Sequence, residues 1–182
     1  MLPDFPQPGP ILLHGARFEV RQVNIPAKKP GQPPQTRELI VHPGAVVILP
    51  ILADGNIALI RNKRWAVGEE LWELPAGTLE PPEPPDQCAA RELIEETGYR
   101  AGRLTHLTDF YSCPGFCTEL LYAFLATDLT HVGQQLEETE QITVEPTPWD
   151  RVLEMIRSHQ IRDAKTIAAL LYYATFMRNA QE

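Results

Sequence analysis

"ELPAGTLEPPEPPDQCAARELIEETGYR", residues Glu73 to Arg100, is the stretch that decides the fold. Within it, residues 86–97 have apolar side chains at helical spacing, and Gly98 follows as a typical C-terminal cap. At about 100° per residue, the expected buried face consists of Ala89, Ala90, Leu93, Ile94 and Thr97. The opposite face carries four charged residues, Arg91, Glu92, Glu95 and Glu96. The sequence therefore predicts an amphipathic helix with a crowded acidic side.

The spacing of these charges leaves two interpretations open. Glu92 and Glu96 are four residues apart, so their carboxylates converge, while Arg91 and Glu95 are spaced to form an ion pair. In the first interpretation the face is solvated, because charged outer faces are common and a like-charge pair costs only about 0.3 kcal/mol on an exposed helix. In the second, a bound cation offsets the repulsion.

The segment before the helix favours the second interpretation. Gly77 is expected in a loop that brings main-chain carbonyl groups near the helix, and Glu83 adds a fourth carboxylate just upstream. Oxygen ligands gathered on a rigid element suit Mg²⁺ or Mn²⁺. The sequence thus predicts a divalent-cation site on this helix.

The composition restricts the partners and the compartment of the chain. Its 182 residues, 43% of them hydrophobic, are enough for one domain with a sizeable core. A formal net charge of −8 argues against nonspecific binding of long nucleic acids, but a small phosphorylated substrate stays compatible because a cation reverses the local field. We expect no signal peptide and no membrane span, since no apolar run approaches ~20 residues. Three cysteines without a zinc or disulfide pattern are typical of a reducing compartment, so we expect a cytoplasmic protein.

The N-terminal part of the chain is expected to be an appendage. Residues 1–43 have the pattern of a Pro-rich arm followed by a hairpin of two strands, Arg17 to Val23 and Arg37 to Val41. The segment between these strands is either a surface loop or an arm that completes a neighbour's site. Residues 44–182 form the main domain.

The order of elements in the main domain predicts its fold class. Two strands around an Asp54–Gly55 turn precede the charged helix, and further strands follow it. Two helices, Trp149 to Ser158 and Asp163 to Met177, finish the chain. This order predicts an α/β or α+β sandwich with a mixed sheet.

The charged stretch resembles a known family signature. Every fixed position of the Nudix hydrolase box is present: Gly77, five residues, Glu83, seven residues, Arg91-Glu92-Leu93, one residue, Glu95-Glu96, one residue, and Gly98-Tyr99. The resemblance implies an α/β/α sandwich with a mixed sheet and N-terminal antiparallel strands. It also implies cleavage of a nucleoside diphosphate that is linked to another group X.

The resemblance further implies roles for individual residues. Glu92 and Glu96 would ligate two or three Mg²⁺ ions, with Mn²⁺ as an alternative, together with the main-chain carbonyl of Ala76. Glu95 would be a further metal ligand, or a catalytic residue that acts beside the metal ligands. Residues that brace the backbone through ion pairs or conformation would be Gly77, Glu83, Arg91 and Gly98.

A second feature resembles one subgroup, the ADP-ribose pyrophosphatases. Pro114 lies sixteen residues beyond Gly98, in the stretch SCPGFCTE, although a cysteine separates Ser112 from Pro114 where the subgroup has Ser-Pro-Gly. An ordinary Pro-Gly turn between strands is the alternative. The subgroup implies that substrate is bound by Glu73, Pro114, Phe116 and Glu119.

Two further segments supply candidate residues. The acidic stretch at residues 137–142 resembles the mobile loop that carries the catalytic carboxylate, which implies Glu138 as general base and Glu140 as its assistant. A solvated acidic turn is the alternative. Arg61 and Arg64 are at a spacing that could place both near a diphosphate, which an arginine fork suits, although solvated strand ends have the same pattern.

The resemblance implies hydrolysis of ADP-ribose to AMP and ribose 5-phosphate by a homodimer that exchanges N-terminal strands. The alternative substrate is another nucleoside diphosphate sugar, such as GDP-mannose. A Nudix-like nucleotide sensor without activity is the alternative of a different class, but such domains usually lose carboxylates that this chain keeps.

Overall fold

The computed structural model describes residues 8–178. They divide into two compact units, residues 8–44 with 111–120 and residues 45–110 with 121–178. Residues 1–7 of the expected Pro-rich arm lie outside the described residues.

The N-terminal unit contains a three-stranded antiparallel sheet. Its strands are β1 (Pro8–His14), β2 (Glu19–Ile25) and β3 (Gln35–Val41), in the order β1-β2-β3. β2 and β3 pair along their whole length, so the predicted hairpin is present, with each strand beginning or ending two residues away from its expected bounds. β1 occupies a segment for which the sequence predicts only an extended arm.

The remaining strands build the sheets of the second unit. They are β4 (Ala45–Pro50), β5 (Ile57–Arg64), β6 (Glu69–Glu73), β7 (Ala76–Thr78), β8 (Tyr99–Arg100), β9 (Arg103–Tyr111), β10 (Leu120–Thr127), β11 (Thr130–His131) and β12 (Ile142–Thr147). The order β7-β4-β10-β9 forms a mixed sheet, because β4 runs parallel to β10 and antiparallel to β7. The order β12-β5-β6 forms an antiparallel sheet, and β11 pairs with β8.

Strand β4 is buried on both faces, which is why its sequence is apolar throughout. Val46 and Ile48 pack in one core cluster with Leu93 of the charged helix. Val47 and Leu49 point to the opposite face, where they belong to a second cluster that includes residues of the two C-terminal helices. The sheet is therefore covered by helices on both sides.

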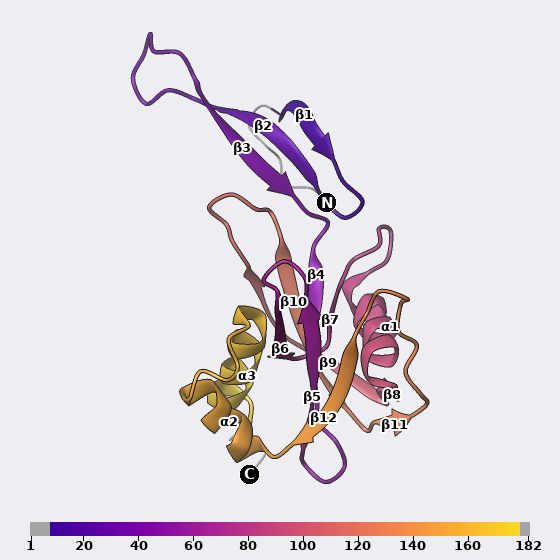
Figure 1. Cartoon of the computed structure of the whole chain (residues 1–182). Helices are drawn as coiled ribbons and strands as arrows, with labels where there is room; N and C mark the ends of the chain where they lie inside the picture. The colour runs from indigo at the N-terminus through magenta and orange to yellow at the C-terminus, as the bar shows by residue number, and fades with distance from the viewer. Residues whose placement is uncertain (1–7, 179–182) are drawn as a thin grey trace. The chain divides into compact units, whose positions relative to one another are not determined.

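Three helices complete these layers. They are α1 (Pro85–Thr97), α2 (Trp149–Arg157) and α3 (Ala164–Phe176). Figure 1 shows α1 on one side of the strands β4, β5 and β10, and α2 and α3 on the other. The predicted sandwich with a mixed sheet is confirmed. Among residues 8–178, every helix is too short or too polar to cross a membrane.

The ends of α1 agree with the sequence, but its predicted buried face is partly wrong. Gly98 has a left-handed φ of 73° and its N–H donates to the Ile94 carbonyl, as expected of a C-terminal cap. Ala90 is only half-buried, whereas Glu92 and Glu96 are buried. The reason is that α1 contacts several strands, including β7, so its acidic flank is covered as well as its apolar one.

Candidate metal and diphosphate site

Strand β7 lies beside the acidic flank of α1 and holds one of its carboxylates. The Ala76 N–H donates to Oε2 of Glu96 at 2.8 Å. Gly77 was expected in a loop, but it pairs with Val46 in the mixed sheet, and so the prediction is wrong at this position. Pairing with β4 gives the Ala76 backbone a more rigid support than a loop would.

Glu92 and Gly77 are packed too tightly for any side chain at residue 77. A Cβ atom added to Gly77 would lie 1.8 Å from Cδ of Glu92 and 1.9 Å from its Oε1. Gly77 does not have a positive φ. Glycine is therefore required here by space, because the Glu92 carboxylate occupies the volume beside the strand.

Burial changes the acidity of the two carboxylates. Glu92 is 9% exposed and Glu96 is 3% exposed. Burial disfavours the charged form and raises the pKa of Glu92 to about 7 and that of Glu96 to about 8. The negative charge of Glu140 raises both pKa values further. Two such buried carboxylates are a costly arrangement in the absence of a cation.

Arg91 organises the other charged groups of the box. Its Nε and Nη2 donate to Glu83 at 3.0 Å each, and its Nη1 donates to Glu92 at 2.7 Å and to Glu95 at 2.9 Å. The hydrogen bonds from Arg91 hold the pKa of Glu83 below its usual range. Arg91 thus joins Glu83 of the segment before the helix to two carboxylates of α1, and the expected pairs with Glu83 and Glu95 are present.

The donor set suits a divalent cation by its chemistry. Two buried carboxylates and the nearby Ala76 backbone are hard oxygen donors on rigid elements, as Mg²⁺ and Mn²⁺ require. In residues 8–178, no three His, Cys, Asp or Glu side chains form a ready-made metal site. Hydrogen bonds with Arg91 and Ala76 hold the carboxylates of Glu92 and Glu96, so we expect these side chains to rearrange on binding a cation.

The close contact at residue 77 yields a testable prediction. We expect Gly77→Ala to fold, because the Glu92 side chain is flexible enough to move away from the new methyl group. The displaced carboxylate should weaken Mg²⁺ binding by about 10-fold or more. Calorimetric titration of the two proteins with Mg²⁺ measures this, and Gly115→Ala, where nothing lies within 4 Å of the added Cβ, is the matched control. Unchanged Mg²⁺ affinity in Gly77→Ala would contradict the assignment of Glu92.

The acidic loop is tied to the C-terminal end of α1. Gln134 Nε2 donates to the Glu96 carbonyl at 2.7 Å, and the Gln135 N–H donates to the Glu95 carbonyl at 3.0 Å. Of the two candidate carboxylates in this loop, Glu140 is half-buried and its charge acts on Glu92 and Glu96, whereas Glu138 is exposed. The loop anchor was not predicted, because neither glutamine belongs to a recognisable motif.

The two arginines of β5 have separate partners. Arg61 pairs with Glu70 and lies over the ring of Trp72, 5.3 Å from its centroid. Arg64 donates two hydrogen bonds to Glu73, at 2.7 and 2.6 Å. The hydrogen bonds with Glu73, together with the charge of Glu96, raise the pKa of Arg64 against the effect of burial. Of the two arginines of β5, Arg64 is therefore the one on which the charge of Glu96 in α1 acts.

Sequence reasoning missed a group of residues at the start of α3. Lys165 donates to Glu73 at 2.5 Å, and Thr166 Oγ1 accepts from the Leu74 N–H at 2.8 Å. Asp163 caps the helix by accepting from the Thr166 N–H. A capping Asp is recognisable in the sequence, but its link to Glu73 is not, because ninety-two residues separate Lys165 from Glu73.

Three other expected substrate-binding residues belong to the N-terminal unit. Pro114, Phe116 and Glu119 lie in residues 111–120, and the Phe116 carbonyl accepts from the Ile40 N–H at 2.8 Å. Oε1 of Glu119 lies 3.7 Å from Nδ1 of His42. These residues are thus attached to β3 of the N-terminal sheet.

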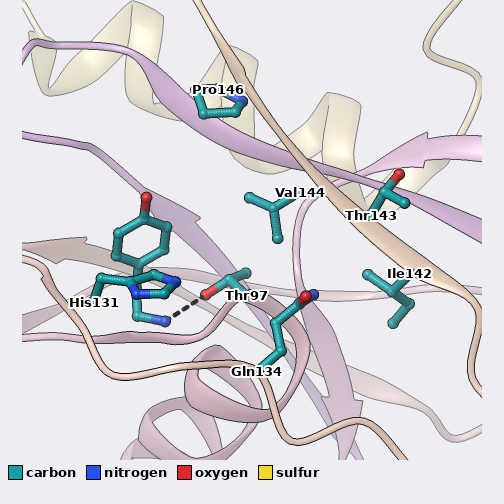
Figure 2. Close-up of a pocket in the computed structure, with 8 residues that line it drawn as sticks. Thr97, His131, Gln134, Ile142, Thr143, Val144 and Pro146 are labelled. Atoms are coloured by element: carbon teal, nitrogen blue, oxygen red, sulfur yellow. Dashed lines mark hydrogen bonds between the residues drawn. The ribbon is translucent and has the colours of Figure 1, made fainter.

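A pocket of about 300 Å³ opens at the C-terminal end of α1 (Figure 2). Its lining residues are Thr97, Tyr99, His131, Gln134, Ile142, Thr143, Val144 and Pro146. None of the expected site residues is among them. Its lining includes the anchor residue Gln134 but neither Glu92 nor Glu96.

Comparison with known proteins identifies the family. Residues 41–170 match the family model of the NUDIX domain, which covers most of the chain, so the chain belongs to the NUDIX family. It is 37% identical over 155 residues to an ADP-ribose pyrophosphatase of Bacillus subtilis, covering 84% of this chain and 82% of that protein.

Two other relatives have related names. An ADP-ribose pyrophosphatase of Mycobacterium tuberculosis is 42% identical over 121 residues, which cover 66% of this chain and 58% of that protein. A GDP-mannose pyrophosphatase of Salmonella typhimurium is 37% identical over 142 residues, which cover 72% and 73%. The crystal structure of an ADP compounds hydrolase superposes with a TM-score of 0.80 at 21% identity and covers 98% of both chains, which shows the same fold.

Proposed function

We propose that this NUDIX protein hydrolyses the diphosphate bond of ADP-ribose, releasing AMP and ribose 5-phosphate, with Mg²⁺ bound at α1. The observation that carries the proposal is the pair of buried carboxylates, Glu92 and Glu96, beside strand β7. The ADP-ribose pyrophosphatase relatives support the substrate, since they cover most of the chain.

The residues of the Nudix box and those of the acidic loop have different roles in the proposed reaction. When bound, Mg²⁺ neutralises the diphosphate and favours ionisation of the attacking water, and Mn²⁺ is an alternative ion. Glu92 and Glu96 would hold two or three such ions together with the Ala76 carbonyl, and Glu95 would assist. Glu138 accepts the proton of the attacking water, and Glu140, whose charge already acts on Glu92 and Glu96, orients that water.

In this proposal, two arginines of β5 bind the diphosphate of the substrate. Arg64 is 39% exposed and the charge of Glu96 acts on it, so it is suited to donate to a diphosphate oxygen. Arg61 contributes from the same strand.

A hydrolysis panel tests the substrate. The pure protein with Mg²⁺ is incubated with ADP-ribose, GDP-mannose, ADP-glucose and diadenosine polyphosphates, and products are identified by mass spectrometry. We expect kcat/KM to be highest for ADP-ribose, with AMP and ribose 5-phosphate as products. The second candidate substrate is GDP-mannose, which the GDP-mannose pyrophosphatase relative favours. Preferential cleavage of GDP-mannose would establish it as the substrate. Tight binding without hydrolysis of any compound would identify a sensor.

We further propose a cytoplasmic homodimer in which residues 1–43 exchange between two copies. The N-terminal sheet supports this arrangement, because it leaves large apolar side chains 41–52% exposed: Ile11, Leu12, Leu13, Phe18 and Ile25. Light scattering is expected to give about twice the 20.5 kDa mass of the chain, and Leu12→Lys with Leu13→Lys should lower it. A wild-type mass of one chain at micromolar concentration would contradict the dimer.

A further inference from the structure

Glu73 is a buried carboxylate with two cationic partners. Its side chain is 1% exposed and lies at the end of β6, three residues before Ala76. Oε2 accepts from Nη2 of Arg64 at 2.6 Å and from Nζ of Lys165 at 2.5 Å, while Oε1 accepts from Nε of Arg64 at 2.7 Å. Their hydrogen bonds and charges outweigh burial and hold the pKa of Glu73 below its usual range. Two cations thus share one carboxylate.

The first turn of α3 holds Lys165 in place. Lys165 Nζ also contacts Oδ1 of Asp163 at 2.9 Å, and Oδ2 of Asp163 accepts from the hydroxyl of Thr166 at 2.6 Å. The same Thr166 hydroxyl accepts from the Leu74 N–H. The helix start therefore binds two consecutive residues of the segment that leads into β7, one through its side chain and one through its backbone.

The two partners of Glu73 differ in their freedom. Arg64 is 39% exposed, and the charge of Glu96 acts on its guanidinium. Lys165 is 16% exposed and is bound to two carboxylates. Arg64 is thus the partner of Glu73 whose side chain can turn toward a ligand. Lys165 is the partner that stays bound to Glu73.

We propose that Lys165 is a positioning residue, which keeps Glu73 paired while Arg64 turns to the diphosphate of the substrate. This inference rests on the proposed function of the site. A buried carboxylate without a cation is strongly disfavoured, so without Lys165 the binding of Arg64 to substrate would leave Glu73 unpaired. Lys165 removes that penalty.

The test measures binding of a non-cleavable ADP-ribose analogue, with a methylene group bridging the two phosphorus atoms, by calorimetry with Mg²⁺. We expect Lys165→Met to weaken binding by about 10-fold, and Lys165→Arg to restore it. Arg64→Met should weaken wild-type binding similarly but have little further effect in Lys165→Met, because Arg64 is then retained by Glu73. Lys63→Met, which removes a lysine from the same strand as Arg64, is the matched control and should bind normally.

A second comparison does not depend on the folding of Lys165→Met. In a Glu73→Gln background the carboxylate that Lys165 would keep paired is absent, so adding Lys165→Met should leave the Kd of the analogue unchanged. A further loss of binding in that background, additive effects of Arg64→Met and Lys165→Met, or normal binding by Lys165→Met would each overturn the inference. If the wild-type protein neither binds the analogue nor cleaves ADP-ribose, the proposed function is contradicted, and the inference about Lys165 with it.

Discussion

Glu96→Gln is expected to lower kcat for ADP-ribose by about 1000-fold. The substitution removes one anionic oxygen donor from the site, and with it the cation that would stabilise charge on the diphosphate in the transition state. A loss of this size corresponds to about 4 kcal/mol of transition-state stabilisation. Steady-state kinetics at saturating Mg²⁺ measures it.

The fold should tolerate this change. Glu96 is 3% exposed, and Oε2 accepts from the Ala76 N–H, a bond that the carbonyl oxygen of glutamine can also accept. Since burial already favours the uncharged form of this side chain, a neutral amide suits the position. Circular dichroism of Glu96→Gln should therefore match the wild type.

The control for this variant is Glu80→Gln, which changes an exposed carboxylate at a variable position of the box and should leave kcat unaltered. Near-normal hydrolysis by Glu96→Gln would remove Glu96 from the metal assignment. A variant that is inactive and also unfolded would indicate a structural role instead.

The metal-free protein is expected to lose stability as pH rises from 5.5 to 8.5, and Glu96→Gln is expected to lose less. The folded-state pKa values of Glu92 and Glu96, about 7 and about 8, lie above the ordinary value of 4.5. The folded state therefore binds protons more tightly than the unfolded state, so ionisation of these groups destabilises the fold. Their stabilising contribution is complete below pH 4.5 and is lost as pH passes through the folded pKa values.

The measured quantity is the free energy of unfolding by urea in EDTA at several pH values. Comparing wild type with Glu96→Gln cancels the titration of groups that do not interact with Glu96, and the difference should reach on the order of 4 kcal/mol at pH 8.5 in favour of the variant. Saturating Mg²⁺ should reverse the order, because a cation stabilises the ionised carboxylates only in the wild type. Equal pH dependence of the two proteins in EDTA would show that Glu96 ionises normally.

Local sequence features predicted the elements well. The helix of residues 86–97 begins one residue earlier in the structure and ends as expected, because a glycine cap and a 3.6-residue apolar period depend on neighbouring residues only. The apolar run that became β4 and the Asp54–Gly55 turn were recognisable for the same reason. The spacing of the box residues was sufficient to indicate the family.

The burial of the charged side of α1 could not be predicted in the same way. Periodicity separates an apolar face from a charged face, and it assumes that the charged face meets solvent. Here β7 covers the part of the charged face that carries Glu92 and Glu96, and the missing side chain of Gly77 leaves room for the Glu92 carboxylate. The burial that raises the pKa values of Glu92 and Glu96 follows from this packing.

By itself the sequence determined the helix, its cap, the sandwich class and the set of carboxylates, because each of these follows from short-range spacing. Only the tertiary structure decided that Arg64 and Lys165 share the carboxylate of Glu73, since burial and ion pairing arise between segments far apart in the chain. The position of a charged residue in the sequence does not determine its partner. The partner is the group that the packing of the core places within hydrogen-bond distance.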